Sequence, residues 1–284
     1  LNDDARSVKI AGKSIDQLSS QSIDELSIFF DGLVFEANAK VIADKILKEI
    51  TERLGFLKEV GLDYLSLNRR ASTLSGGEEQ RVRLATQIGT KLTGVLYVLD
   101  EPSIGLHQID NQKLIGSLLK LRDLGNSVLV VEHDSETMLA ADELIDLGPG
   151  AGRHGGYLVE QGPPHKIKKG LTAEFLLNKR SIEIPKNRRK TSGKSLKIVN
   201  ATLHNLKGID FEVPLGLFTV VTGVSGSGKS TLVLDVFSES LRQRSPVGCK
   251  AVEGLDLVDK VIRVDQSPIG RSPRSNPSTY IGLF

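Results

Sequence analysis

The stretch Gly223-Val224-Ser225-Gly226-Ser227-Gly228-Lys229-Ser230 decides the fold of this chain. Its glycines let successive backbone N–H groups converge on an anion, Lys229 adds a positive charge, and the Ser230 hydroxyl can bind Mg²⁺. Apolar residues at 218–222 predict a strand before it, and a helix is expected from Thr231. A glycine-rich turn with an incidental lysine would lack this context, so we predict a phosphate-binding loop. Its nucleotide-binding residues would be Gly223, Ser225, Gly226, Ser227, Gly228, Lys229, Ser230 and Thr231.

A second glycine motif stands much earlier, in Leu74-Ser75-Gly76-Gly77-Glu78-Glu79-Gln80-Arg81. At a helix start, Ser75, Gly76 and Gly77 offer a hydroxyl, exposed amides and the positive end of the helix dipole, which suits a γ-phosphate. A serine N-cap followed by two flexible glycines explains the same residues without a ligand. From the motif alone, both interpretations stay open.

Acidic and histidine side chains follow two near-continuous apolar runs, which predict parallel strands covered on both faces. Asp100 and Glu101 follow the run at 95–99, and His133 follows the run at 127–131. Asp100 can hold Mg²⁺ through water, Glu101 can polarise an attacking water as general base, and His133 can hydrogen-bond a γ-phosphate. A solvated turn and a structural histidine are the alternatives.

Hydrophobic periodicity predicts the elements around these motifs. A long amphipathic helix is expected over 39–60, with apolar residues Ile42, Ala43, Ile46, Leu47, Ile50, Leu54 and Leu57. A second helix should begin at the Ser-Gly-Gly turn and direct Val82, Leu84, Ala85 and Ile88 inward. A third is expected over 112–124, and further strands over 196–200, 209–213 and 260–264. This alternation predicts an α/β fold.

Length and composition limit the number of domains and the kinds of site and partner that this chain can have. At 284 residues with 39% hydrophobic residues, the length suggests about two domains. The one cysteine excludes an intrachain disulfide and a four-thiolate zinc site, and a net charge of +2 gives no general argument for nucleic acid. No apolar run of ~18 residues and no signal peptide is visible, so a cytoplasmic location is expected. The missing initial methionine suggests a fragment.

Basic residues dominate from 163 to 197, where only Glu174 and Glu183 are acidic. Pro185 and Gly193 lie in the second half of this stretch, which we interpret as a linker. A solvated tether and a nucleic-acid contact both fit its charge.

Together these motifs resemble those of ABC-type ATPases, but their order is reversed. A single ABC domain runs from phosphate loop to signature to Walker B strand, whereas here the signature at 74–81 and the Walker B residues Asp100 and Glu101 precede the loop. The spacing between signature and Walker B favours the phosphate interpretation of Ser75, Gly76 and Gly77. The resemblance implies an α/β P-loop NTPase fold of ABC type, with two partial nucleotide-binding modules and a helical signature region.

Further roles follow from the same resemblance. His133 stands where the family has its switch histidine, and 103–106 where it has its D-loop. Gln80 lies in the signature, and Gln266 is at the place of the Q-loop glutamine, which contacts Mg²⁺ and the attacking water. Predicted Mg²⁺ ligands are therefore Ser230, Gln266 and Asp100.

Longer stretches are similar to the UvrA family, the ATPases of the bacterial excision nuclease UvrABC. They are Thr73-Leu74-Ser75-Gly76-Gly77-Glu78, Asp100-Glu101-Pro102-Ser103-Ile104-Gly105-Leu106-His107, Asp146-Leu147-Gly148-Pro149-Gly150-Ala151-Gly152 and Asp265-Gln266-Ser267-Pro268-Ile269-Gly270-Arg271-Ser272-Pro273-Arg274-Ser275-Asn276-Pro277. Transport ATPases generally place Ala-Leu-Asp after the D-loop serine, where this chain has Ile104-Gly105-Leu106-His107.

This resemblance implies a homodimeric subunit that uses ATP and Mg²⁺ to recognise damaged double-stranded DNA in nucleotide excision repair and the SOS response, and that loads UvrB. Damage would be read through DNA deformability. The expected organisation is a signature region at 1–94, a Walker B and switch-histidine part at 95–185, a linker at 186–195 and the start of a second module at 196–284. The family's zinc-binding cysteines are absent from this chain.

The split modules have a mechanistic consequence. In ABC-type sandwiches the phosphate loop of one module faces the signature of the other, so Lys229 and Ser230 should meet Ser75 and Gly77. Asp100, Glu101 and His133 would serve the other site, and neither site would be complete. We therefore expect nucleotide binding with weak turnover. A transport ATPase, a translation-type ABC protein and a non-enzymatic binding module are the alternatives.

Overall fold

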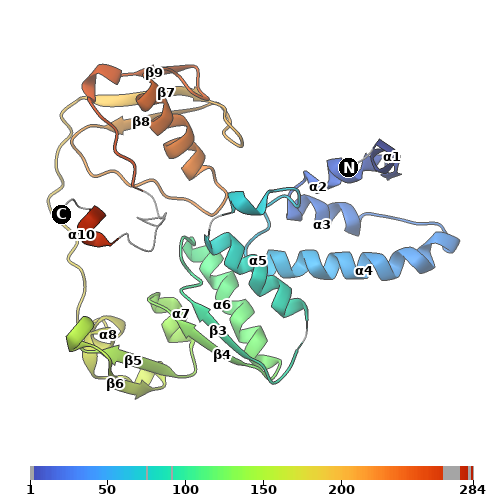
Figure 1. Cartoon of the computed structure of the whole chain (residues 1–284), viewed down its shortest axis with the longest axis horizontal. Coiled ribbons are helices and arrows are strands. Elements are labelled where there is room, and N and C mark those ends of the chain that lie inside the picture. The colour runs from blue at the N-terminus through green and yellow to red at the C-terminus, as the bar shows by residue number, and fades with distance from the viewer. Residues whose placement is uncertain (1–2, 75, 91, 265–275, 281–282, 284) are drawn as a thin grey trace. The chain divides into compact units, whose positions relative to one another are not determined.

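A computed structural model describes residues 3–74, 76–90, 92–264, 276–280 and 283. The chain divides into two compact units (Figure 1). The first comprises Leu1–Lys186 with Gly223–Ser227, and the second comprises Asn187–Thr222 with Gly228–Phe284.

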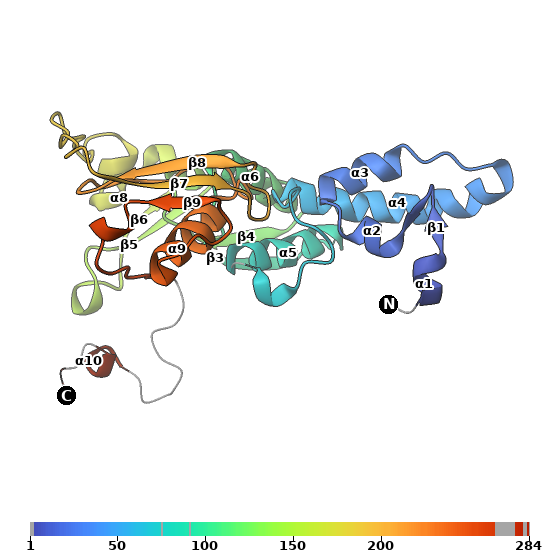
Figure 2. The same cartoon turned by 90° about the horizontal axis from the view of Figure 1, so that it is seen from above.

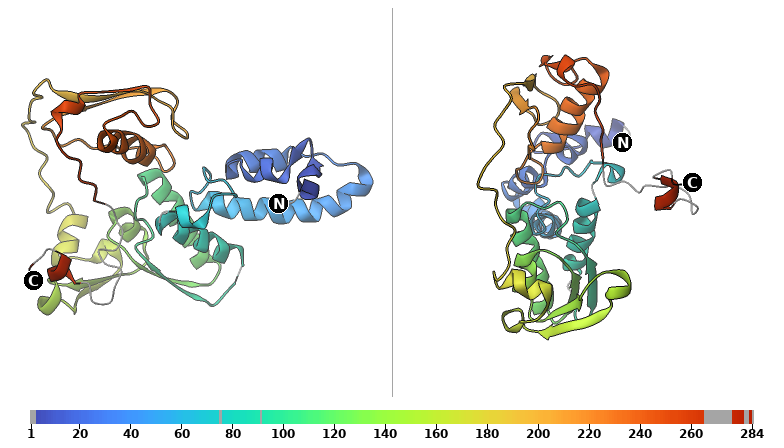
Figure 3. Two further views of the ribbon diagram at one scale, coloured as in Figure 1. Left: turned by 45° about the horizontal axis from the view of Figure 1, so that its top comes forward. Right: turned by 90° about the vertical axis from the view of Figure 1, so that its left-hand side faces the viewer.

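The first unit begins with short elements around one long helix, α4 (Ala37–Glu59). Before it come α1 (Asp3–Ser7), β1 (Lys9–Ile10), β2 (Lys13–Ser14), α2 (Ile15–Ser19) and α3 (Ile23–Asp31). Ser22 caps α3, because its hydroxyl accepts the Glu25 N–H at 3.2 Å while the Glu25 carboxylate accepts the Ser22 N–H at 2.8 Å. Helix α3 lies alongside α4 (Figure 3).

The helix predicted over 39–60 is confirmed as α4, but its apolar stripe is buried only in the second half. Leu54 is buried, whereas Ile42 and Ile46 are 68% and 55% exposed. The second half packs with α3, α5 and α6 in one core, and the first half extends beyond it. Amphipathic periodicity in a sequence cannot show where the covering neighbours end.

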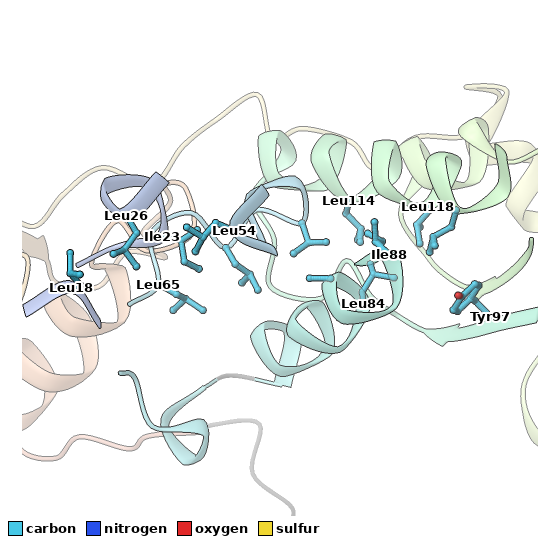
Figure 4. Packing of buried hydrophobic residues seen from close by; sticks show 14 residues of the cluster. Leu18, Ile23, Leu26, Leu54, Leu65, Leu84, Ile88, Tyr97, Leu114 and Leu118 are labelled. Atoms are coloured by element: carbon cyan, nitrogen blue, oxygen red, sulfur yellow. The ribbon is translucent and has the colours of Figure 1, made fainter. Parts of the chain in front are cut away.

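The centre of the first unit is a two-stranded parallel sheet with helices on one face. Strand β3 (Leu96–Asp100) pairs with β4 (Ser127–Val131), and Leu96 lies opposite Ser127. Helices α5 (Gly76–Gly89) and α6 (Gln108–Asp123) pack against the sheet through the core shown in Figure 4. The short helix η1 (Ala71–Thr73) precedes α5. Of the predicted inward residues of α5, Leu84, Ala85 and Ile88 are buried, and Val82 is half-buried against the same core.

The expectation that these strands are covered on both faces is wrong for the described structure. Tyr97 is buried toward the helices, but its neighbours Leu96 and Val98 are 61% and 65% exposed. Leu129 and Val131 are also exposed. Since successive side chains point to opposite faces of a strand, one whole face lacks a covering layer among the described residues.

The rest of the first unit follows β4. It contains α7 (Ser135–Ala140), the antiparallel pair β5 (Leu144–Gly148) and β6 (Tyr157–Gly162), and α8 (Gly170–Leu176), with short helices η2 (Gly152–His154) and η3 (Pro164–Lys166). Residues 179–194 are exposed. No helix in the described part of the chain is long and apolar enough to cross a membrane.

The second unit is an antiparallel sheet with a helix packed on it (Figure 2). Strand β7 (Ser195–Ala201) lies between β8 (Ile209–Pro214) and β9 (Ala251–Glu253). The helix begins with π-type turns, η4 (Thr231–Ser238), and continues as α9 (Glu239–Gln243). Leu232 and Val236 of η4 join Ile198 and Ala201 of β7 in the core. The short helices η5 (Leu255–Leu257) and α10 (Pro277–Tyr280) complete the elements described here.

Two predicted strands are not formed. Residues 218–222 and 260–264 have no strand hydrogen bonds, and Phe218 and Val264 are 95% and 90% exposed. A run of apolar residues becomes a buried strand only beside a pairing neighbour, and the described residues provide none for either segment. The predictions over 196–200 and 209–213 are confirmed by β7 and β8.

Candidate nucleotide site

The parallel pairing of β3 and β4 places the ends of both strands at one edge of the sheet. Directly beyond β3, the Glu101 N–H donates to the Val131 carbonyl at 2.8 Å. Glu101 has a φ of +44°, a left-handed conformation that is uncommon for residues with a side chain and is enriched at functional sites.

Glu101 and His133 meet at this edge. The Glu101 Oε1 lies 3.1 Å from the His133 Nε2, and the His133 side chain is 81% exposed. A carboxylate and an imidazole at this distance can share a proton and orient a water molecule. The structure therefore brings together the two predicted catalytic residues, which are far apart in the sequence.

Asp100 is exposed at the end of β3 and is contacted by the signature helix. The Gln80 Nε2 donates to the Asp100 carbonyl oxygen at 3.0 Å, and both residues line a shallow depression with Gly76, Glu79 and Arg83. The described residues hold no group of three or more His, Cys, Asp or Glu side chains suited to a metal. A lone carboxylate still fits Mg²⁺, which is commonly held by one or two carboxylates, water and substrate phosphates.

The start of α5 is packed closely against the D-loop. A Cβ at Gly77 would lie 2.8 Å from the Ile104 carbonyl oxygen, so this position requires glycine, whereas Gly76 has open space around it. In the same first turn of α5, the buried Glu78 carboxylate accepts the Tyr64 hydroxyl at 2.6 Å. Burial, followed by this hydrogen bond, raises the pKa of Tyr64 above its usual range. Ser75 lies outside the described residues.

The phosphate-binding loop has the positive φ angles that glycine permits. Gly226 and Gly228 have φ of 74° and 95°. Within the first unit, the Ser225 N–H donates to the buried Asp110 Oδ2 at 3.1 Å. One backbone amide of the loop therefore binds a carboxylate oxygen of the protein itself. Within the second unit, a Cβ at Gly228 would lie 2.8 Å from the Asn205 Oδ1.

Two expectations remain predictions. Gln266 lies outside the described residues. The expected approach of Lys229 and Ser230 to Ser75 and Gly77 is not tested, because Ser75 is not described and Lys229 and Gly77 belong to different units.

No sequence-based expectation covers Glu132, which is part of the same edge. Its carboxylate accepts the backbone N–H and the hydroxyl of Ser103, both at 2.9 Å. The one signal in the sequence is an acidic residue directly before the predicted switch histidine. That signal is weak, because a glutamate in a loop is usually solvated.

Asp134 caps α7 and joins it to α6. Its Oδ2 accepts the Thr137 N–H and the Asn111 Nδ2, both at 2.8 Å. Burial opposes ionisation of Asp134, but these hydrogen bonds outweigh it and lower the pKa of the carboxyl below its ordinary value. The turn that contains His133 is thus fixed on its C-terminal side.

The similarity of this chain to known proteins covers its whole length. No family model matches it. The chain is 56% identical over 295 residues to UvrABC system protein A of Aquifex aeolicus (strain VF5), covering 100% of this chain and 32% of that protein. It is 53% identical to UvrABC system protein A of Staphylococcus aureus (strain COL), covering 100% of this chain and 31% of that protein.

A solved structure is similar as well. The crystal structure of UvrA2 from Deinococcus radiodurans matches with a TM-score of 0.91 and 39% identity, covering 100% of this chain and 36% of that one. The chain spans 31–32% of the length of the two curated relatives. Sequence and fold therefore agree: the chain has the α/β fold of ABC-type P-loop ATPases and belongs to the UvrABC system protein A family.

Proposed function

We propose that this chain forms part of an ATP-hydrolysing subunit that recognises damaged double-stranded DNA in nucleotide excision repair. The observation that carries this is the Glu101–His133 pair at the end of β3, in a chain 56% identical to a UvrABC system protein A. A half-buried carboxylate and an exposed imidazole 3.1 Å apart suit activation of water at a γ-phosphate.

In this proposal the site residues have separate tasks. Glu101 is the general base, and His133 hydrogen-bonds the γ-phosphate. The loop from Gly223 to Thr231 binds the phosphates of ATP, with Lys229 supplying charge, and Ser75, Gly76, Gly77 and Gln80 contribute from the signature. Asp100, Ser230 and Gln266 would hold Mg²⁺, which when bound neutralises charge on the β- and γ-phosphates.

The two halves belong to different modules. Residues 1–94 and 95–185 are the signature and Walker B parts of the first module, 186–195 is the linker, and 196–284 begins the second module. Asp100, Glu101 and His133 would then face a phosphate loop other than the one at 223–230. This arrangement supports nucleotide binding with weak or no turnover by the chain alone.

The partners of the whole protein follow from the same proposal. The intact protein is a cytoplasmic homodimer that loads UvrB onto damaged DNA. Salt-sensitive binding of the intact protein to damaged duplex would support this function, because neutralised phosphates release counterions. Co-purification with a membrane subunit would instead support a transport ATPase, and co-sedimentation with ribosomes a translation-type protein.

DNA-stimulated ATP hydrolysis by the intact protein tests the proposal. Lys229→Ala should lower turnover by roughly 10²-fold and abolish discrimination between damaged and undamaged duplex, since it removes a charge aimed at the phosphates. Lys207→Ala, an exposed lysine in the same unit, is the matched control and should retain both activities. Unchanged ATP turnover in Lys229→Ala would contradict the proposal.

A further inference from the structure

The Glu132 side chain joins the two turns that follow β3 and β4. Its Oε1 accepts the Ser103 N–H at 2.9 Å, and its Oε2 accepts the Ser103 hydroxyl at 2.9 Å and the His133 N–H at 3.0 Å. The Asp134 N–H lies 3.4 Å from the same Oε2. Most surface carboxylates are hydrated, whereas this one is engaged by four protein donors.

These hydrogen bonds close a short ring around the candidate catalytic pair. Glu101 is two residues before Ser103, and His133 directly follows Glu132. The fully buried Pro102 fixes the chain between Glu101 and Ser103. Two contacts complete the ring, one between Ser103 and Glu132 and one between Glu101 and His133.

We propose that Glu132 is a positioning residue that holds His133 against Glu101 during ATP hydrolysis. This inference rests on the proposed function. Without the carboxylate, the two turns lose the link between Ser103 and Glu132, and only the Glu101–His133 contact and the hydrogen bond from the Glu101 N–H to the Val131 carbonyl still join them among the contacts named above. The exposed His133 side chain would then be free to leave Glu101, and a displacement of about 1 Å can reduce a rate by about 10²-fold.

Only a side chain with two accepting oxygens suits this place. All four neighbouring groups donate hydrogen bonds, and a carboxylate has two oxygens that accept. A glutamine of the same shape has one accepting oxygen, and its amide nitrogen would face donors in either orientation. Glu132→Gln therefore disrupts the link without opening a cavity.

Steady-state ATP hydrolysis by the intact protein is the first test. Glu132→Gln should lower kcat about tenfold or more and change the KM for ATP less than about twofold, because the variant alters positioning and not nucleotide binding. Glu143→Gln is the matched control, since the Glu143 carboxylate is exposed and accepts, among the described residues, only from the Gln161 Nε2 at 3.2 Å. It should retain the wild-type kcat.

A double variant separates positioning from a general loss of structure. If Glu132 acts through His133, Glu132→Gln should cause no further loss of kcat in a His133→Ala background. Hydrogen exchange should also accelerate in peptides covering 102–104 and 132–134, and not elsewhere in the protein. Exchange is measured without nucleotide, so it reports the link independently of activity.

Three results would overturn the inference. They are an unchanged kcat in Glu132→Gln, an equal fractional loss of kcat in the wild-type and His133→Ala backgrounds, and unchanged hydrogen exchange at both turns. If the wild-type protein and Glu143→Gln hydrolyse ATP, any of these results removes only the inference. If the wild-type protein itself lacks ATP turnover, the proposed function and the inference both fail.

Discussion

The carbonyl oxygen of Ile104 lies 2.8 Å from the position that a Cβ would take at Gly77. The start of α5 and the loop at 103–106 are thus in close backbone contact. The neighbouring Gly76 has nothing within 4 Å of its Cβ position. Glycine is therefore required at position 77 by a close backbone contact, whereas position 76 has room for a side chain.

Replacement of these two glycines should have opposite effects. Gly77→Ala should lower the free energy of unfolding by about 1–3 kcal/mol, because the methyl group forces the D-loop away. Gly76→Ala should be neutral or stabilising by up to about 1 kcal/mol, since alanine favours the helix. Thermal unfolding of both variants measures the difference. Equal stability of the two variants would show that the contact with Ile104 is unimportant.

Asp134→Asn should show a pH-dependent loss of stability. The pKa of Asp134 is lowered below its ordinary value of 3.8 in the folded state, so the unfolded state binds more protons and the carboxylate stabilises the fold above that value. Near neutral pH the variant should be less stable by about 1 kcal/mol. This difference should shrink as the pH falls below 3.8 through the folded-state pKa.

Urea unfolding of the wild type and Asp134→Asn at a series of pH values, from neutral to about pH 3, checks this expectation. Glu143→Gln serves as the control, because an exposed carboxylate with one amide partner should give a small difference at every pH. A gap between wild type and Asp134→Asn that stays constant across the series would contradict the linkage.

Leu114→Ala should destabilise the first unit strongly. Leu114 is fully buried on α6, and its truncation removes apolar contacts and leaves a cavity, which costs about 3 kcal/mol or more. Leu124 follows the same helix and is 43% exposed, so Leu124→Ala should cost less than about 1 kcal/mol. Chemical denaturation of this chain gives both values, and similar losses would argue against the packing of α6 described above.

Tyr64→Phe should test the buried Glu78 at the signature helix. The variant removes the hydroxyl that donates to the Glu78 Oε1 at 2.6 Å, which should lower the free energy of unfolding by about 1–3 kcal/mol. Tyr157→Phe is the matched control, because Tyr157 is 65% exposed on β6. Equal stability of Tyr64→Phe and the wild type would mean that Glu78 does not depend on this donor.

Sequence alone was sufficient where a property depends on neighbouring residues. The loop at 223–230 needs glycines at set positions, and all three of them, Gly223, Gly226 and Gly228, adopt positive φ in the structure. The helix over 39–60 and the strands β3 and β4 likewise follow from local periodicity. Asp100, Glu101 and His133 could be selected because each follows an apolar run at the spacing typical of ABC ATPases.

Tertiary structure decided everything that depends on a distant neighbour. The parallel pairing of β3 with β4 brings Glu101 to His133, and the Glu132 link to Ser103 exists only because both turns lie at one edge. The apolar run at 218–222 forms no strand, because hydrogen bonds and burial come from a partner that its own residues cannot specify. Local sequence thus determined which residues can perform the chemistry, and strand pairing determined which of them meet.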